Sequence, residues 1–431
     1  MKTRTLKFMF SLMISMLVLA LAMPVEASEI NWKSKNKQNI DTLKYNVFKG
    51  KVIDQETRKP LIFATIALKE TNMATVTNSD GEFLLKVPKI STADQIRISF
   101  IGYKTLMVPL NTLKKTKNIL RMEVATTTLM EVSVFPHDPE MIIKQLLRKV
   151  KENYSTDPNM MKGFYRETIK KNRHYVAISE AIVNIHKSGY TQMRDDQVQI
   201  YKGRKSTDVK RMDTLMFKLQ GGPYTTLLLD VVKNPFTILS ENFLNNYNYK
   251  MKNVTKIDGR LHYVIEFRQK QEIDFPLYYG LMYIDTQNMA LSSAKFSLNL
   301  ENKAEATKMF IRKKPAGAKV TPTAANYLVT YRQQNGKWYF NYARGEINFK
   351  CNWKRRLFNT NYSAMSEVAI TDRGTENVVR YKPRDRFKSR DVLMDQIDNF
   401  ADDNFWGSDN TIEPDQSIES AIRKLKRKRR R

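Results

Sequence analysis

The chain has 431 residues, enough for two or three domains, and 42% of them are hydrophobic, which excludes a wholly disordered polypeptide. Its formal net charge is +29, from 73 Lys and Arg against 44 Asp and Glu, a balance typical of proteins that meet nucleic acid or an anionic membrane. The single cysteine, Cys351, excludes an internal disulfide and a metal site built from several thiolates.

The first 27 residues have the order of a secretory signal peptide. Basic residues open the chain, an uncharged apolar run follows over 8–23, and small side chains precede a cut between Ala27 and Ser28. The apolar run is short for a membrane anchor, which needs roughly 20 residues. No cysteine stands at the cut to receive a lipid. We therefore predict export to the periplasm, a polar spacer over 28–44, and peripheral rather than integral association with a membrane.

Export changes the meaning of the charge, because an exported protein does not meet the chromosome. Nucleic acid is therefore not expected as a partner, and an anionic envelope surface or an envelope protein is. The leader contributes +2 and the last nine residues +8, which leaves +19 for the body. A basic tail can bind a charged membrane surface. The residues predicted to contact such a surface are Arg423, Lys424, Lys426, Arg427, Lys428, Arg429, Arg430 and Arg431.

Residues 45–124 are predicted to form a seven-stranded antiparallel β-sandwich, since short β-branched and aromatic runs alternate with turns such as Asn78–Gly81. Segments 50–54, 60–66, 77–83 and 98–103 occur in the order of the carboxypeptidase-regulatory-like domain and closely resemble it. That resemblance implies a transthyretin-like accessory module, often found in exported envelope proteins and transporters. It does not imply peptidase activity.

A linker over 125–137 follows the sandwich. Its segment 129–134 resembles the stretch that follows this module in TonB-dependent transporters, where it acts as a TonB box. Such a segment can add a strand to an exposed sheet edge. The alternative is a strand that completes the sandwich, and this is the interpretation we favour, because the chain leaves no room for a transporter's barrel.

Residues 138–372 are predicted to form a larger curved antiparallel sheet or half-barrel with a leading helix. Asp138 and Pro139 mark the start of that helix. Long strands then alternate with hairpin turns at 257–260 and 334–337, and 215–244 interrupts them as helices or a covering loop. The strand order resembles the half-barrel of outer-membrane lipoprotein carriers, which implies a cavity and an acyl chain as its ligand.

Residues 373–431 are predicted to be a C-terminal helical segment with the basic tail. Helices are expected over 391–400 and 415–428. The stretch that separates these two helices contains Phe405–Gly407 and Ile412–Pro414 and looks like a docking loop. The whole of 136–422 resembles the non-barrel part of an exported family of unknown function.

The search for chemistry finds no catalytic residue, no metal site and no cofactor motif. His137 and Glu140 have an H-x-x-E spacing, with His262 far downstream, but a helix start is the wrong context for a zinc carboxypeptidase site. Cys351 is expected to be a structural thiol although lysines flank it, and Asp195 and Asp196 to be a solvated loop.

The sequence thus favours a non-enzymatic, exported envelope protein that acts as a binding or accessory module at the periplasmic face of the outer membrane. The alternative is a periplasmic carrier of lipid or lipoprotein that uses a cavity in the second domain. The composition and spacing do not name the ligand, the partner or the oligomeric state.

Overall fold

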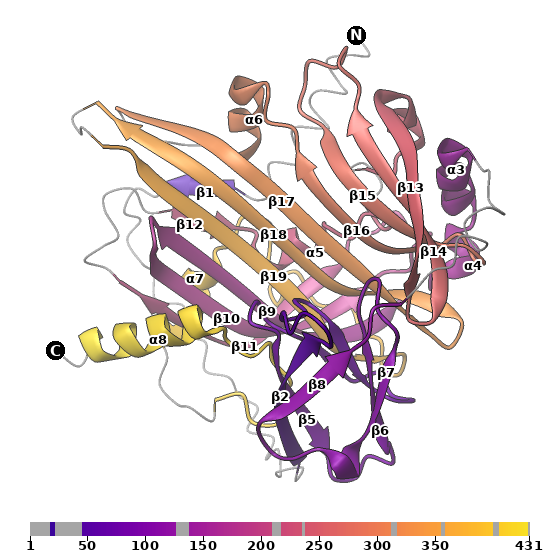
Figure 1. Ribbon diagram of the computed structural model, residues 1–431. Coiled ribbons are helices and arrows are strands. Elements are labelled where there is room, and N and C mark those ends of the chain that lie inside the picture. Colours follow the sequence, from indigo (N-terminus) through magenta and orange to yellow (C-terminus); the bar gives the residue numbers. More distant parts are fainter. Residues whose placement is uncertain are drawn as a thin grey trace.

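The computed structural model describes residues 18–21, 45–125, 138–208, 217–234, 238–311, 317–354, 358–399 and 405–429. The predicted cleavage between Ala27 and Ser28, the spacer and the 129–134 segment lie outside the described residues. The structure is mainly β, with a small sandwich at one end of a large open sheet and few helices (Figure 1).

The sandwich has the seven strands expected from the sequence, in sheets ordered β5-β2-β8 and β4-β3-β6-β7. One pairing corrects the expectation of an antiparallel fold: β8 runs parallel to β2, because it reaches the sheet by crossing over from the opposite layer. Val52, Ile66, Leu85 and Ile98 are buried in the core between the layers. The strands are β2 (Tyr45–Asp54), β3 (Thr65–Leu68), β4 (Ala74–Val76), β5 (Glu82–Pro88), β6 (Gln95–Ser99), β7 (Leu106–Pro109) and β8 (Asn118–Met122), with a 3-10 turn, η1 (Leu110–Thr112), after β7.

The large sheet is an open antiparallel array ordered β13-β14-β15-β16-β17-β18-β19-β9-β10-β11, with the two-residue β20 parallel at its edge. The predicted hairpin turns are confirmed: Asp258-Gly259 and Asn335-Gly336 have positive φ at both residues, as a two-residue type I′ turn requires. The strands are β9 (Asn159–Lys171), β10 (His174–Lys187), β11 (Gln197–Thr207), β13 (Tyr247–Ile257), β14 (Arg260–Gln269), β15 (Tyr278–Asp285), β16 (Leu291–Leu298), β17 (Ala318–Gln334), β18 (Lys337–Trp353), β19 (Thr360–Gly374) and β20 (Asp398–Asn399).

The helices are short and lie between or beside the strands. The leading helix begins as predicted, since the Asp138 side chain accepts from Glu140 N and Pro139 is the first helical residue. It is split at Lys149 into two pieces. The predicted helix 391–400 is wrong, because only one turn forms before the chain pairs with β11. The helices are α3 (Pro139–Arg148), α4 (Val150–Asn153), α5 (Gly222–Leu227), η2 (Glu241–Asn246), α6 (Lys303–Phe310), α7 (Leu393–Gln396) and α8 (Gln416–Arg429).

A further pair of strands, β1 (Val18–Leu21) and β12 (Phe217–Gln220), forms a separate small sheet. The first of these strands lies within the apolar run predicted to be a signal peptide. Cleavage between Ala27 and Ser28 would remove it and leave β12 without this partner.

Both faces of the large sheet are covered around β9, β10 and β19, and this explains why these strands are buried almost throughout. One face, here called the inner face, packs against residues 219–234 and 238–244, which we call the covering segment. It lies within 215–244, the stretch predicted to interrupt the strands. The other, the outer face, packs against the sandwich and against residues 405–415, which we call the docking loop.

Candidate functional site

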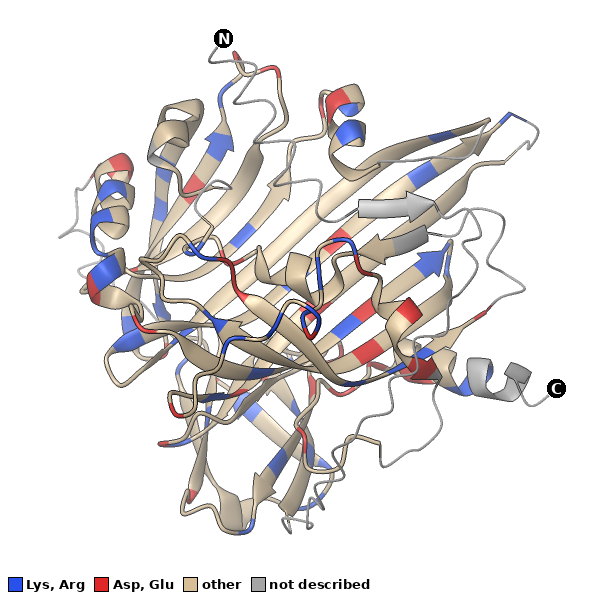
Figure 2. Cartoon of the chain, turned by 180° about the vertical axis from the view of Figure 1, so that it is seen from behind, with Lys and Arg blue, Asp and Glu red and all other residues tan. Residues whose placement is uncertain are grey.

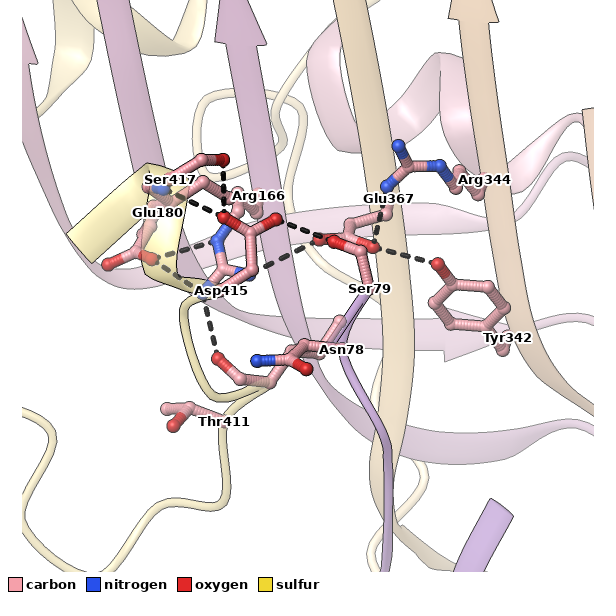
Figure 3. A network of polar contacts seen from close by, with 12 residues as sticks. Asn78, Ser79, Arg166, Glu180, Tyr342, Arg344, Glu367, Thr411, Asp415 and Ser417 are labelled. Carbon is pink, nitrogen blue, oxygen red and sulfur yellow. Dashed lines mark hydrogen bonds and ion pairs between the residues drawn. The ribbon is translucent and has the colours of Figure 1, made fainter. Parts of the chain in front are cut away.

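The three parts of the protein meet on the outer face of the large sheet, in a network of buried charges (Figure 3). The network draws on the sandwich through Ser79, on the sheet through Arg166 and Glu367, and on the C-terminal segment through Asp415. These residues are far apart in the sequence, so the network exists only in the assembled fold.

Arg166, on β9, is the centre of this network and is 1% exposed. Its guanidinium donates to Glu180 on β10 (Nε to Oε1, 2.9 Å), to Glu367 on β19 (Nη1 to Oε1, 3.3 Å) and to the carbonyl oxygen of Ile412 in the docking loop (2.7 Å). Burial acts to raise the pKa of Glu180, but Arg166 and Arg204 lower it overall, so this carboxylate is held ionised.

Glu367 connects the centre of the network to β18. Its Oε2 accepts from the Tyr342 hydroxyl at 2.7 Å and from Arg344 at 3.3 Å. Arg344 in turn pairs with Glu346 at 3.1 Å and stacks over the ring of Phe63 from the sandwich, 5.2 Å from its centroid. The sandwich therefore contacts the sheet through charged groups as well as through apolar ones, since Phe63 also stacks on the ring of Tyr342, with centroids 5.3 Å apart.

Asp415 closes the network at the start of α8. Its carboxylate accepts from Ser79 (2.6 Å), from Ser417 (2.7 Å) and from Ile418 N (2.7 Å), the last two as a helix cap. Burial acts to raise the pKa of Asp415, but these hydrogen bonds and Arg166 lower it overall. The predicted start of a helix at 415 is thus confirmed, and the carboxylate that caps this helix also holds the sandwich.

The docking loop was predicted from its aromatic and apolar residues, and the structure confirms it. Trp406 packs edge-on against Phe164 of β9, with ring centroids 5.6 Å apart, and the guanidinium of Arg204 lies 4.7 Å from its ring centroid. Asp409 pairs with Lys162 at 3.0 Å and Lys202 at 2.6 Å. The loop therefore binds the sheet through both apolar and ionic contacts.

A polar pocket of about 330 Å³ opens beside this network, between the sandwich and the first turn of α8. Its walls include Phe63 and Asn78 of the sandwich, Lys170 and Tyr175 of the β9–β10 hairpin, and Glu346 of β18. We call it the junction pocket. A second pocket, of about 760 Å³, lies elsewhere on the large sheet beside Arg268 and Tyr279.

The residues predicted to bind an anionic surface lie at the exposed end of α8. Arg423 and Lys424 are exposed, and Arg423 pairs with Glu419 at 3.1 Å. The backbone of 426–429 continues the helix, while their side chains and residues 430–431 are outside the part that the structure describes. Ile418 and Ile422 anchor α8 on Ile178 of β10, which points the basic end away from the sheet (Figure 1).

Sequence reasoning missed a second basic segment, residues 380–390, which we call the basic strip. Every second residue in it is Lys or Arg, and this alternation was the signal that could have revealed it. Of these six side chains all but Arg386 are exposed. Phe387 anchors the strip in the core beside Val198, at the end of β11 opposite to the one that α8 contacts. The strip and the tail therefore lie apart.

The basic surface extends beyond these two segments. Lys and Arg are distributed over the sheet, the sandwich and the helices, with Asp and Glu between them (Figure 2). Where the described chain brings charges together on the outer face, they are paired as in the network. In the basic strip Arg384 pairs with Asp385 at 3.7 Å, and Arg386 donates to the carbonyl oxygen of Tyr381 at 2.7 Å.

The other candidate residues have structural contacts. His262 is buried in β14, where its Nδ1 lies 2.9 Å from the Arg260 carbonyl oxygen, and Glu140 pairs with Lys144; His137 is outside the described residues. Burial raises the pKa of Cys351 to about 12, as befits an unreactive thiol. The prediction of a solvated loop is wrong for Asp196, which pairs with the buried Lys187 at 2.6 Å.

Neither a metal site nor a membrane span is seen in the described part of the chain. Within those ranges, no three His, Cys, Asp or Glu side chains gather closely enough to hold a metal ion. Among the helices described, none combines the length and the apolar character that crossing a membrane requires.

Residues 48–134 match the model of the CarboxypepD_reg-like domain. This match contains the sandwich strands and extends into the linker, and it covers the N-terminal module only. Comparison with curated proteins finds no match.

Solved structures similar to the remainder include three bacterial proteins. A domain named for outer membrane lipoprotein sorting, from Vibrio parahaemolyticus, has 9% identity and a TM-score of 0.25, covering 56% of this chain and 95% of that one. A DUF1329 family protein from Desulfovibrio piger has 10% identity and a TM-score of 0.23, covering 57% and 96%. A LolA superfamily protein from Nitrosomonas europaea has 11% identity and a TM-score of 0.19, covering 57% and 98%. With TM-scores this low, nothing about ligand or function follows from these likenesses.

Proposed function

We propose that this protein is a non-enzymatic, exported binding module that docks peripherally on an anionic surface of the cell envelope, at the periplasmic face of the outer membrane. The observation that carries the proposal is the basic strip, with five exposed Lys and Arg side chains within eleven residues. Phe387 and Leu393 fix the strip to the sheet from within, so it is presented on a rigid support.

Charge and location support a membrane surface as the partner. The signal-like leader predicts export to the periplasm. In that compartment the anionic lipids of the membrane surface are an abundant source of negative charge. Each basic residue close to such a surface contributes about 1 kcal/mol to binding, and the contribution falls within a Debye length. The basic end of α8 would add a second contact, separate from the strip.

Sedimentation with vesicles tests the proposal. The mature chain is mixed with vesicles of phosphatidylcholine containing phosphatidylglycerol, at low and at high salt. We expect binding at low salt that falls as salt rises. Replacing Lys382, Arg384 and Lys388 with Glu should weaken binding by at least about a hundredfold, because the loss of three positive charges costs about 3 kcal/mol and the new carboxylates are repelled by the surface.

A matched control keeps the net charge equal. Replacing three exposed basic residues of the sandwich, Lys114, Lys117 and Arg121, with Glu makes the same change in charge at another place. Equal losses in the two triple variants would show that only overall charge matters and would contradict docking by the strip. Deletion of 423–431 measures the contribution of the tail, and unchanged pelleting would remove the tail from the proposal.

A second candidate function is a periplasmic carrier of lipid or lipoprotein, and the open curved sheet favours it. Side chains of the covering segment, such as Leu239 and Phe243, pack on the inner face where an acyl chain would lie. A ligand would therefore have to displace them. Native mass spectrometry of the purified protein decides between the candidates: a co-purifying acyl ligand supports the carrier, and a ligand-free mass contradicts it.

A further inference from the structure

The junction pocket has unused hydrogen-bonding capacity, although the charge network beside it is paired. Arg166 and Glu367, which form part of its lining, use their polar atoms on each other and on neighbours. Two other lining residues, Asn78 and Lys170, each have a side-chain nitrogen that makes no hydrogen bond within the part of the chain that the structure describes. Both are hydrogen-bond donors, so the pocket favours a ligand that carries acceptors.

Asn78 provides a donor fixed in position. Its side-chain oxygen accepts from the backbone nitrogens of Asp80 (2.9 Å) and Glu82 (2.8 Å), which sets the orientation of the amide in the Asn78–Gly81 turn. The residue is 3% exposed, and among the described residues its Nδ2 has no hydrogen-bond partner. A buried donor without a partner destabilises the fold, and a ligand that accepts from it would offset this cost.

Lys170 provides a positive charge without a carboxylate partner among the described residues. Its ammonium lies over the ring of Tyr175, 4.4 Å from the centroid, and the side chain is half-buried at the pocket wall. Cations held against an aromatic ring and partly shielded from water form strong charge-assisted hydrogen bonds to anionic oxygens. This position therefore selects a ligand with one acidic group.

The remaining lining suits a compact polyhydroxylated molecule. The rings of Phe63 and Tyr175 supply flat apolar surfaces. The carboxylate of Glu346 and the hydroxyl oxygens of Ser363 and Ser417, which donate their protons to Glu346 and Asp415, supply acceptors. Sugar hydroxyls both donate and accept, and the faces of a sugar ring are apolar. A volume of about 330 Å³ is at the lower end of the range for ligand pockets and matches one such ring rather than an acyl chain.

We propose that the junction pocket binds an acidic monosaccharide unit, such as a uronic acid, with its carboxylate on Lys170 and a ring oxygen or hydroxyl on Asn78 Nδ2. The ligand would touch the sandwich, the sheet and α8 together, and so it would stabilise the assembled state. This site is independent of the basic strip, and saccharide binding is measured without any vesicle.

Saturation-transfer NMR on the full mature chain tests the proposal, with D-glucuronate, D-glucose and acetate as probes. We expect glucuronate to bind at least about tenfold more tightly than glucose or acetate, since one charge-assisted hydrogen bond contributes about 1.5–3 kcal/mol. The substitution Lys170→Met should abolish the preference for glucuronate, and Lys170→Arg should keep it.

Arg268→Met in the second pocket is the matched control, because it removes a cation that also lies over a tyrosine ring, that of Tyr279 at 5.6 Å. It should leave glucuronate binding unchanged. Thermal unfolding of each variant separates loss of binding from loss of fold. Absence of glucuronate binding, equal binding of glucose or acetate, or unchanged selectivity in Lys170→Met would each overturn the proposal.

Discussion

The two faces of the large sheet use buried charge in different ways. On the outer face a network runs from Glu180 through Arg166 to Glu367 and Arg344, and it joins three parts of the chain. On the inner face the packing is mostly apolar, and one cluster around Asp230 holds the covering segment in place. The outer face therefore specifies how separate parts assemble, while the inner face fills a core.

The inner cluster joins the covering segment to two strands of the sheet. Asp230 accepts from Lys187 Nζ (2.6 Å), Tyr190 (2.9 Å) and Tyr331 (2.7 Å); Lys187 ends β10, Tyr190 follows that strand, and Tyr331 lies on β17. Each of these groups is buried and paired. The cluster therefore fixes the covering segment at Asp230, while hydrophobic contacts and further hydrogen bonds, such as that from Thr226 to Ser366 (3.0 Å), hold the rest of it. Removal of charge is expected to affect domain assembly on the outer face and local packing on the inner face.

The largest effect is expected for Arg166→Met, which leaves Glu180 and Glu367 buried without their shared cation. Breaking a buried ion pair by removing one partner costs about 3–5 kcal/mol. Urea unfolding measures the loss of stability, and limited proteolysis reports release of the docking loop. Arg121→Met, at an exposed position of β8, serves as control and should change stability by less than about 0.5 kcal/mol. Equal stabilities for the two variants would contradict the role given to the network.

A pH-dependent effect is expected on the inner face at Glu167. Burial raises the pKa of this carboxyl from 4.5 to about 7, while a hydrogen bond from Tyr165 (2.8 Å) acts against the rise. Between these two values the folded state keeps a proton that the unfolded state has released, so stability falls as pH rises, by about 3 kcal/mol in all. Glu167→Gln should flatten this fall in unfolding measured between pH 4.5 and 7, and an unchanged pH profile would show that Glu167 does not titrate there.

A smaller effect is expected for Asp230→Asn, because Lys187 keeps its second partner, Asp196. Losing charge-assisted hydrogen bonds at this point should cost about 1.5–3 kcal/mol. Hydrogen exchange should show faster opening of 222–234 with little change in the sandwich. Faster exchange throughout the sandwich would contradict the separation of the two faces.

The smallest effect is expected for Lys104→Met, which breaks a salt bridge to Glu123 (2.9 Å) on the surface of the sandwich. Both side chains are exposed, and such pairs contribute about 0–1 kcal/mol. A shift in the urea midpoint comparable to that of Arg166→Met would show that burial is not what separates these two ion pairs.

Much of the fold could be predicted from the sequence because its signals are local. Each of these signals depends on neighbours within a few positions of the sequence. Examples are the helix caps at Asp138 and Asp415, the turn at Asp258-Gly259 and the apolar residues of the docking loop. The alternation of long strands indicated one large antiparallel sheet. The helix over 391–400 failed as a prediction because pairing with β11 overrides its amphipathic pattern.

The candidate site could not be predicted, since its residues look like solvated strand positions. Charged residues such as Arg166 and Glu367 normally face water, and nothing in their strands marks them as buried, while Glu180 stands between Ile178 and Ile182 on its face of β10. Only the sandwich and the docking loop, arriving from distant parts of the chain, bury that face. Asn78 carries a turn signal, but nothing local indicates that its free amide nitrogen lines a pocket beside Lys170.

The net charge also divides into a part that the sequence determines and a part that the fold determines. The sequence by itself determined the +29 excess, the leader-like start, the sandwich module and the basic tail, because composition and short motifs fix these properties. The tertiary structure decided which charges are paired in the interior and which are left exposed, as in the basic strip. The reason is physical: the free energy of a charge depends on burial and on partners within a few ångströms, and these are supplied by residues hundreds of positions away.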